Sequence, residues 1–199
     1  MKKRTLESIL EIALKTFPVV LLNGARQVGK STLALDSFKN YITFDDGELR
    51  LYAKENPKGF LKNLELPICL DEIQKVPSVL EYIKMYIDSN KVIGDFLLTG
   101  SSNVLDHKDS KDTLAGRLCE LRLHPLSSKE KNDKPNENVI EKLLNRDFKL
   151  AKKDYSDEII NHILAGGYPE ILELKGFSKD LWFKSYIATY IERDARDLA

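Results

Sequence analysis

The stretch Asn23–Thr32 reads NGARQVGKST, and residues 24–31 of it fit the pattern G-x-x-x-x-G-K-[ST] of a phosphate-binding P-loop. The glycines of such a loop let the backbone curl so that successive N–H groups point at phosphate oxygens, and the following helix adds its positive end. Lys30 is expected to reach the β- and γ-phosphates, and the Ser31 hydroxyl is expected to hold Mg²⁺. The pattern predicts that all of these residues contact nucleotide: Gly24, Ala25, Arg26, Gln27, Val28, Gly29, Lys30, Ser31 and Thr32.

The residues on either side of this loop favour a strand before it and a helix after it. Residues 18–24 (PVVLLNG) form a short, continuous apolar run closed by glycine, which is typical of a strand buried on both faces. A helix is expected to begin near Lys30. Residues 6–17 carry apolar side chains at helical spacing, so the chain is expected to open with an amphipathic helix. A strand followed by a helix is the context that a P-loop requires.

Four further apolar segments predict strands that alternate with helices: 40–46 (NYITFDD), 66–72 (LPICLDE), 95–103 (DFLLTGSSN) and 119–126 (CELRLHPL). A helix is expected over 78–89. The alternation predicts an α/β fold, a P-loop NTPase three-layer sandwich with a mainly parallel five-stranded sheet, followed by a helical C-terminal segment. In such sheets ligands bind beyond the carboxyl ends of the strands, where these segments carry polar residues.

The segment LPICLDE places two carboxylates at the end of a predicted buried strand. Asp71 suits the acid that orients Mg²⁺ in P-loop enzymes. Glu72 follows directly and suits a general base that polarises an attacking water molecule. Asp45 and Asp46 also end a strand, but they could instead cap a turn. ATP and Mg²⁺ are therefore the predicted ligands, and the sequence lacks the N-K-x-D strand end expected of a GTPase.

Two further groups are weaker candidates for catalytic roles. Thr99, Ser101 and Ser102 follow a predicted strand, where they could sense the γ-phosphate or hold the water molecule; a simple turn is the alternative. Arg117 could stabilise charge in the transition state, either in its own subunit or from a neighbouring one. A surface ion pair between Arg117 and Glu120 is the alternative for this residue.

Composition narrows the class of protein. Lys and Arg together number 31, as do Asp and Glu, so net charge gives no argument for nucleic acid or an anionic membrane as a partner. No run of about 20 apolar residues predicts a membrane span, and the N-terminus lacks the apolar run of a signal peptide. Cys69 and Cys119 lie in separate apolar runs and are expected to be buried, reduced thiols. We therefore expect a cytoplasmic protein.

The predicted domain boundary follows Leu126. Residues 1–126 are expected to form the P-loop ATPase core, and residues 127–199 a helical lid or linker segment. The boundary is marked by the polar, charged stretch SSKEKNDKPNENV, which is typical of a loop. In the last predicted helix Trp182, Tyr186 and Tyr190 recur every four residues and form one stripe. We expect this stripe to pack on a further domain or on another subunit.

Taken together, these motifs resemble a group of archaeal and bacterial ATPases of the AAA+ superfamily, known as AAA family ATP-binding proteins. The resemblance rests on GARQVGKST, TFDD, ICLDEIQKVP, FLLTGSSN, LAGR with HPLS, GGYPE and YIATYIERDARDL, in this order along the chain. It implies a strand inserted between the P-loop strand and the strand of Asp71, and it implies a sensor position at residues 99–102. Members continue past the last helix into a second domain of unknown function, whereas this chain stops at Ala199, so we expect that domain to be absent.

Three functions remain open from the sequence. The first is a slowly hydrolysing switch ATPase that acts on a protein or nucleic-acid partner or within a homo-oligomer. The second is a nucleotide-binding regulatory fragment without turnover. The third is a small-molecule kinase, which the absence of a compact Arg-rich lid segment disfavours. An acid beside the Mg²⁺ ligand favours water as the acceptor of the phosphoryl group.

Overall fold

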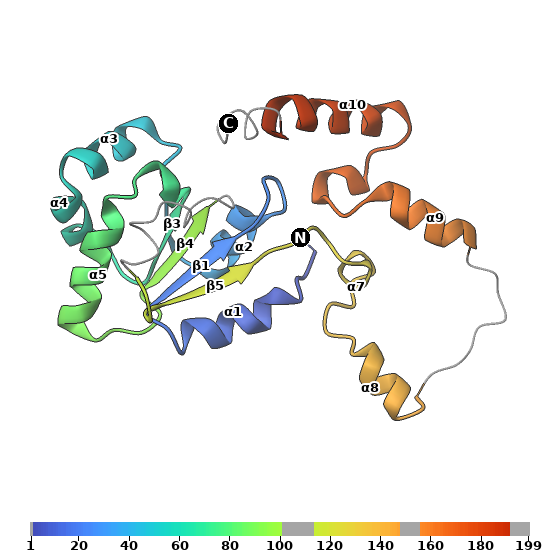
Figure 1. Cartoon of the computed structure of the whole chain (residues 1–199), viewed down its shortest axis with the longest axis horizontal. Helices are drawn as coiled ribbons and strands as arrows, with labels where there is room; N and C mark the ends of the chain where they lie inside the picture. The colour runs from blue at the N-terminus through green and yellow to red at the C-terminus, as the bar shows by residue number, and fades with distance from the viewer. Residues whose placement is uncertain (1, 101–113, 148–155, 192–199) are drawn as a thin grey trace. The chain divides into compact units, whose positions relative to one another are not determined.

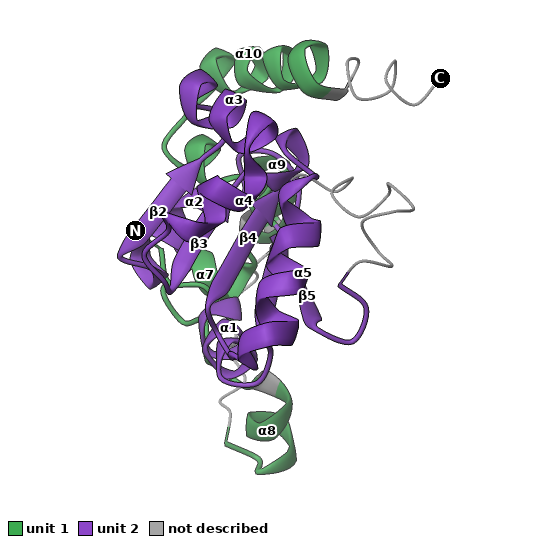
Figure 2. Cartoon of the chain, turned by 90° about the vertical axis from the view of Figure 1, so that its left-hand side faces the viewer, with its two compact units in different colours: residues 1–5, 125–199 green, residues 6–124 purple. Residues whose placement is uncertain are grey.

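The computed structural model describes residues 2–100, 114–147 and 156–191. The chain divides into two units, which Figure 2 shows in different colours. One unit comprises residues 6–124, and the other comprises residues 1–5 and 125–199. Within the described residues, every helix is too short or too polar to cross a membrane.

The larger unit is built on a parallel sheet of five strands in the order β2-β3-β4-β1-β5. The strands are β1 (Val19–Asn23), β2 (Asn40–Thr43), β3 (Ile68–Asp71), β4 (Phe96–Gly100) and β5 (Leu118–Arg122). This confirms the predicted fold class. It also confirms the inserted strand, because β4 lies between β1, which leads into the glycine-rich loop, and β3, which ends at Asp71.

The register of the strands brings their carboxyl ends to one edge of the sheet. Asn23, at the end of β1, is aligned with Gly100 of β4 and with Arg122 of β5. Thr43, at the end of β2, is aligned with Asp71 of β3. The polar residues that follow β1, β2 and β3 therefore start from the same edge, at which β4 ends with Gly100.

Helices cover both faces of this sheet, as Figure 1 shows. One face packs against α3 (Gly47–Glu55), α4 (Pro57–Lys62) and α5 (Val79–Asn90), and this layer forms the main hydrophobic core. Buried apolar residues of β1, β3 and β4 meet buried residues of α5 there, for example Leu21, Leu70 and Leu98 with Ile83. The other face carries α1 (Leu6–Leu14), beside β1, and α2 (Lys30–Ser37), beside β3 and β4. The predicted three-layer arrangement is confirmed.

Helices α3 and α4 were not predicted, and they correct the reading of residues 40–46. Strand β2 ends at Thr43, and Asp46 is the N-cap of α3, where its Oδ1 accepts hydrogen bonds from the N–H groups of Glu48 and Leu49. Asp46 thus has the capping role that the sequence left open. In α4, Pro57 occupies the first turn, where its missing N–H costs no helical hydrogen bond.

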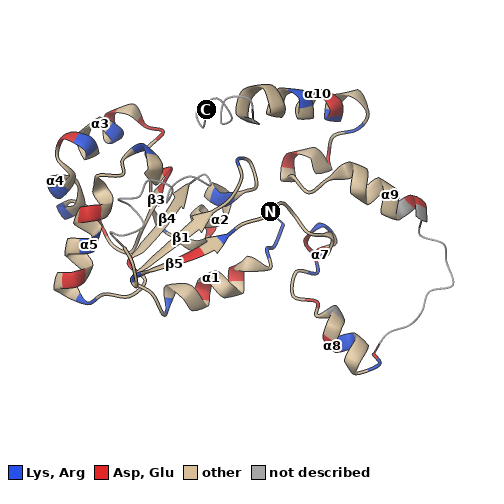
Figure 3. Cartoon of the chain, in the orientation of Figure 1, with Lys and Arg blue, Asp and Glu red and all other residues tan. Residues whose placement is uncertain are grey.

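The two cysteines differ in their surroundings. Cys69 is fully buried in β3, and burial together with the charge of Asp71 raises the pKa of its thiol far above the ordinary value. Cys119 lies on the edge strand β5 and is only half-buried, so the prediction of a buried thiol is correct for Cys69 alone. Both are free thiols. Figure 3 shows charges of both signs along α3 and α5 of this unit, whereas α4 carries only lysines.

The second unit is helical in its described part. Its helices are α7 (Ser128–Lys131), α8 (Val139–Leu144), α9 (Ser156–Ala165) and α10 (Phe177–Tyr186), with a short 3₁₀ helix η2 (Pro169–Leu172) and a π-helical turn η3 (Ile187–Ile191). Glu130 of α7 is buried and accepts hydrogen bonds from Arg4, the Thr5 N–H and the Ser127 N–H. Burial alone would raise the pKa of Glu130, but these hydrogen bonds and the charge of Arg4 outweigh it and lower that pKa.

The predicted aromatic stripe is present on α10 and η3. The rings of Trp182 and Tyr186 stack with centroids 5.1 Å apart, and the Tyr186 and Tyr190 centroids lie 5.2 Å apart. Tyr168 packs against the first two of these rings and donates a 3.2 Å hydrogen bond to the Tyr186 hydroxyl. What covers this stripe stays a prediction.

Candidate functional site

The glycine-rich loop starts from a residue that the sheet holds firmly. Asn23 is buried, and its Nδ2 donates a 2.9 Å hydrogen bond to Glu120 of β5. Its Oδ1 accepts from the Gly24 N–H at 2.6 Å, and its carbonyl accepts from the Leu123 N–H at 2.7 Å. The chain therefore leaves β1 in a fixed direction.

Gly24 and Gly29 have separate steric reasons to be glycine. At Gly24 the φ angle is +151°, and a Cβ atom would lie 2.3 Å from the carbonyl oxygen of Leu123. Real Cβ atoms essentially never approach so closely, so any side chain there would displace the loop from β5. Gly29 has φ +98° at the N-cap of α2, a left-handed conformation that glycine adopts without strain.

The middle of the loop presents different side chains to solvent and to the core. Val28 is fully buried and anchors the loop, whereas Ala25, Gln27 and Thr32 are exposed and Arg26 is half-buried. Gln27 has a positive φ of +60°, which is uncommon for a residue with a side chain. The loop therefore holds a tightly curled backbone between β1 and α2.

Lys30 lies under this loop rather than in solvent. Its side chain is only 6% exposed, and its Nζ donates hydrogen bonds to the carbonyl oxygens of Gly24 at 3.0 Å and Ala25 at 2.9 Å. Burial lowers the pKa of Lys30, and the charges of Glu72 and Asp71 act in the opposite direction. The ammonium group is thus held at the loop by two backbone carbonyls, and the charges of two carboxylates favour its protonated form.

Asp71 is the centre of the hydrogen-bond network at the sheet edge. Its side chain is 4% exposed, and Ser31 Oγ lies 3.2 Å from its Oδ1 and 3.3 Å from its Oδ2. The Tyr41 hydroxyl donates to Oδ2 at 2.6 Å, and the Thr99 hydroxyl donates to Oδ1. Burial and this contact with Asp71 raise the pKa of Tyr41 far above the ordinary value. Three hydroxyl groups from three elements therefore fix one carboxylate.

Glu72 follows Asp71 but lies outside the strand, in a left-handed conformation with φ +57°. Its side chain is half-buried, and its Oε2 accepts a hydrogen bond from Gln74 Nε2. Its N–H donates to Thr99 Oγ1 at 3.4 Å. Thr99 is fully buried and contacts both acidic residues, so the structure brings together Lys30, Ser31, Asp71, Glu72 and Thr99.

The structure does not bring Arg117 to this group. Arg117 precedes β5, so it lies at the amino end of a parallel strand, whereas the glycine-rich loop follows the carboxyl end of β1. Its Nε donates to Asp88 in the last turn of α5, whereas the alternative that the sequence left open was an ion pair with Glu120. The structure therefore contradicts the expectation that Arg117 could act on nucleotide within its own subunit, because Arg117 and the loop lie at opposite ends of the sheet. Ser101 and Ser102, the other two sensor candidates, lie outside the described residues.

Sequence reasoning missed two residues of this site, Tyr41 and Asn23. Tyr41 is aligned with Cys69, two positions before Asp71 on the neighbouring strand, a diagonal that a long aromatic side chain can span. This pairing needs the strand order, which the sequence does not supply. Asn23 stood within the quoted motif, and its polar side chain at the end of an apolar strand was the available signal.

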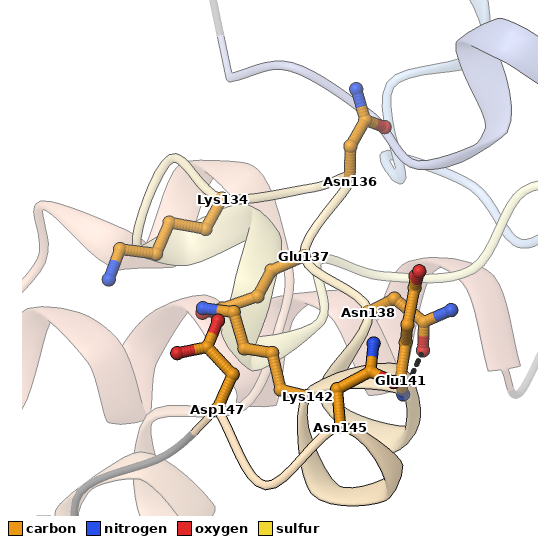
Figure 4. A pocket seen from close by; sticks show the side chains of 8 residues that line it. All are labelled: Lys134, Asn136, Glu137, Asn138, Glu141, Lys142, Asn145 and Asp147. Carbon is orange, nitrogen blue, oxygen red and sulfur yellow. Dashed lines mark hydrogen bonds and ion pairs between the residues drawn. The ribbon is translucent and has the colours of Figure 1, made fainter.

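A hollow of about 570 Å³ lies in the second unit, and none of the residues predicted for the site lines it (Figure 4). It is lined by polar and charged side chains around α8. In it, Asn138 caps α8 by accepting from the Glu141 N–H at 3.1 Å, and Lys142 forms an ion pair with Glu137. The hollow is lined by the surface of a short helix and contains none of the predicted phosphate- or metal-binding residues, so it is not a candidate site.

Curated proteins that are similar to this chain match it over nearly its whole length. The chain is 27% identical over 99% of its length to an uncharacterized protein of Mycobacterium tuberculosis, of which it covers 40%. It is 28% identical over 97% of its length to an uncharacterized protein of Methanocaldococcus jannaschii, of which it covers 45%. The chain thus spans less than half the length of these curated relatives.

Among solved structures, the chain is similar to AMPPCP-bound DnaA from Aquifex aeolicus, with a TM-score of 0.44 and 17% identity over 94% of this chain and 64% of that one. Residues 156–199 match the model of a domain of unknown function (DUF8612). Residues 16–132, more than half of the chain, match the family model described as AAA domain. The chain belongs to this family of AAA domains.

Proposed function

We propose that this chain binds ATP together with Mg²⁺ and hydrolyses it slowly, as a switch that changes contacts to a protein or nucleic-acid partner or to sister subunits. One observation carries the proposal: Lys30, Ser31 and Asp71 meet at the mouth of a glycine-rich loop, with Ser31 Oγ 3.2 Å from Asp71 Oδ1. A loop, an ammonium group and a hydroxyl–carboxylate pair are the parts that P-loop enzymes use to bind phosphates.

The geometry of Lys30 supports phosphate binding. Its ammonium group donates to two loop carbonyls, so it is already held beside the curled backbone of residues 24–29. Phosphate oxygens are stronger acceptors than carbonyls for a charged donor, because both partners then carry charge. Lys30 can therefore exchange its loop contacts for contacts to phosphate without leaving its place.

The oxygen atoms of Ser31 and Asp71 fit a magnesium ion. Mg²⁺ prefers hard oxygen ligands and binds through one or two protein groups together with phosphates. Bound there, it would neutralise charge on the phosphate oxygens. Tyr41 and Thr99 hold the Asp71 carboxylate from two sides, so its oxygens keep a fixed orientation toward Ser31.

Glu72 is the residue that we assign to water activation. Its carboxylate is half-buried and lies on the chain next to Asp71, and a general base of this kind is typically worth about 10²- to 10⁴-fold in rate. Slow turnover is part of the proposal because Arg117 lies at the opposite end of the sheet. An arginine supplied by a partner can add about 10³- to 10⁵-fold in P-loop enzymes.

The test combines nucleotide binding with phosphate release. Equilibrium titrations with ATP and GTP, with and without Mg²⁺, are expected to show saturable binding that prefers ATP and needs the metal. A single-turnover assay, with protein in excess over radiolabelled ATP, is expected to show slow release of phosphate. Failure to bind either nucleotide would contradict the proposal, and binding without any release would favour a regulatory fragment.

The same assay addresses the partner. Measured at several protein concentrations, a rate that rises with concentration would indicate that sister subunits complete the site. Stimulation by added DNA would indicate a nucleic-acid partner. A rate that depends neither on protein concentration nor on DNA would favour a different protein as the partner.

A further inference from the structure

The backbone of Glu72 is held on both sides. Its N–H donates to Thr99 Oγ1 at 3.4 Å, and its carbonyl accepts from the Lys75 N–H at 3.0 Å. Its φ of +57° requires such support, because a non-glycine residue in this region is strained. The Cα of Glu72 is thus fixed, whereas its half-buried side chain keeps three rotatable bonds that the backbone does not restrain.

The side chain of Gln74 supplies that missing restraint. Its Nε2 donates a 2.5 Å hydrogen bond to Oε2 of Glu72. The nitrogen faces the carboxylate for a chemical reason, since the amide oxygen in its place would set two acceptors against each other. One carboxylate oxygen of Glu72 is therefore engaged by Gln74.

Gln74 is a poor choice for stability alone. Its Oε1 atom is buried and, among the described residues, has no hydrogen-bond partner. A buried acceptor in that state destabilises the fold, and an apolar residue of similar size would avoid this cost. The contact that the amide does make is with Glu72, so its benefit lies at that carboxylate.

We propose that Gln74 is a positioning residue, which holds the Glu72 carboxylate in the orientation that activates water. This inference rests on the proposed ATP hydrolysis. With Oε2 held by the amide, the carboxylate cannot rotate freely, and Oε1 is the oxygen that accepts the proton. Displacement of a catalytic group by about 1 Å can cost about 10²-fold in rate, so even a small freedom at Glu72 slows the reaction.

The test uses Gln74→Leu, which is close in size and lacks the amide, and Gln74→Glu, which replaces the donor by a second carboxylate. Asn63→Leu is the matched control, because it removes an amide that donates to the exposed Tyr52 hydroxyl. Three quantities are measured for each variant: the melting temperature, the affinity for a fluorescent Mg²⁺–ATP analogue and the single-turnover rate.

We expect Gln74→Leu to keep or raise the melting temperature, to leave the affinity unchanged, and to lower the rate by about 10- to 100-fold. Gln74→Glu is expected to be slower still, because it repels Glu72. In the Glu72→Gln background, where no carboxylate is left to hold, Gln74→Leu is expected to change the residual rate by less than about twofold.

Three results would overturn the inference while leaving the proposed function intact. One is hydrolysis by Gln74→Leu at the wild-type rate. Another is an equal slowing by Gln74→Leu with and without Glu72, which would place its effect elsewhere. A lowered melting temperature with lost affinity would assign Gln74 a structural role and would also overturn it. Absence of hydrolysis in the wild type would instead defeat the proposed function, and this inference with it.

Discussion

Ser31 Oγ lies 3.2 Å from Oδ1 of Asp71, although 40 residues separate them along the chain. Ser31 is in the first turn of α2 and Asp71 is the last residue of β3, so the two come from elements that follow different strands. In the proposed metal site the two side chains would bind the same ion, which requires that they lie side by side. The fold brings them into this position.

The first prediction is that Ser31→Ala and Asp71→Asn weaken ATP binding chiefly in the presence of Mg²⁺. Both side chains are proposed to act on the ion, so titrations in EDTA are expected to show much smaller losses. Ser37→Ala is the control, since its hydroxyl donates to a backbone carbonyl of the same helix. An equal loss with and without the metal would mean that the two residues support the structure instead.

The second prediction is that Lys30→Met abolishes ATP binding and preserves or raises the melting temperature. Burial lowers the pKa of Lys30, which means that folding disfavours its charged form. The cost is present at neutral pH and falls as the pH rises from the lowered pKa of the folded state to the ordinary value of 10.5, above which it is gone, so a neutral side chain removes it. Lys39→Met, at an exposed position after α2, is the control. Tight binding of a fluorescent ATP analogue by Lys30→Met would contradict the assigned role.

The third prediction concerns the tyrosine that the sequence did not reveal. Tyr41→Phe removes the hydroxyl that donates to Asp71 Oδ2 at 2.6 Å and leaves the ring in place. Residues that orient a metal ligand are typically worth about 10- to 100-fold in metal affinity. We expect the Mg²⁺ concentration for half-maximal ATP binding to rise by about tenfold. Tyr52→Phe is the control, and the same Mg²⁺ requirement in both variants would remove Tyr41 from the site.

The fourth prediction is that Gly24→Ala lowers both the melting temperature and nucleotide affinity. A Cβ atom at this position would lie 2.3 Å from the backbone carbonyl of Leu123, which cannot move without disturbing β5. Strain of this kind costs about 1–3 kcal/mol. Gly116→Ala is the matched control, because Gly116 also has a positive φ, +76°, but nothing lies within 4 Å of the added atom. Equal destabilisation of both variants would show that backbone conformation alone matters.

The sequence predicted the central strands β1, β3 and β4 well because each is a buried, mostly apolar run that ends in polar residues or glycine. The runs before Gly24 and Asp71 are buried on both faces of a parallel sheet, which leaves a continuous apolar signal. Helices α3 and α4 escaped prediction because they are short and only Ala53 and Phe60 in them are buried, so their periodicity is faint. A capping aspartate such as Asp46 looks like a ligand until the helix behind it is known.

The site was predictable to the extent that its residues lie within one motif. The loop residues and the pair Asp71–Glu72 each form a short local pattern. Tyr41 and Gln74 belong to the site through side-chain hydrogen bonds to Asp71 and Glu72. A sequence motif does not show where a side chain points or which residue it reaches, so these two residues could not be predicted. The position of Arg117 could have been predicted from the sequence. Arg117 precedes a strand that is parallel to β1, so it lies at the amino-end edge of the sheet, whereas the P-loop begins at the carboxyl-end edge.

The most direct test of the central claim is the single-turnover rate of Glu72→Gln, measured beside its affinity for Mg²⁺–ATP. Gln is nearly isosteric with Glu, so the variant is expected to bind with near-normal affinity, since Lys30, Ser31 and Asp71 are untouched. The carboxylate that accepts the proton of water is lost, and a general base is typically worth about 10²- to 10⁴-fold, so the rate is expected to fall by at least about 100-fold. Hydrolysis by Glu72→Gln at the wild-type rate would contradict the assignment of Glu72 as the general base.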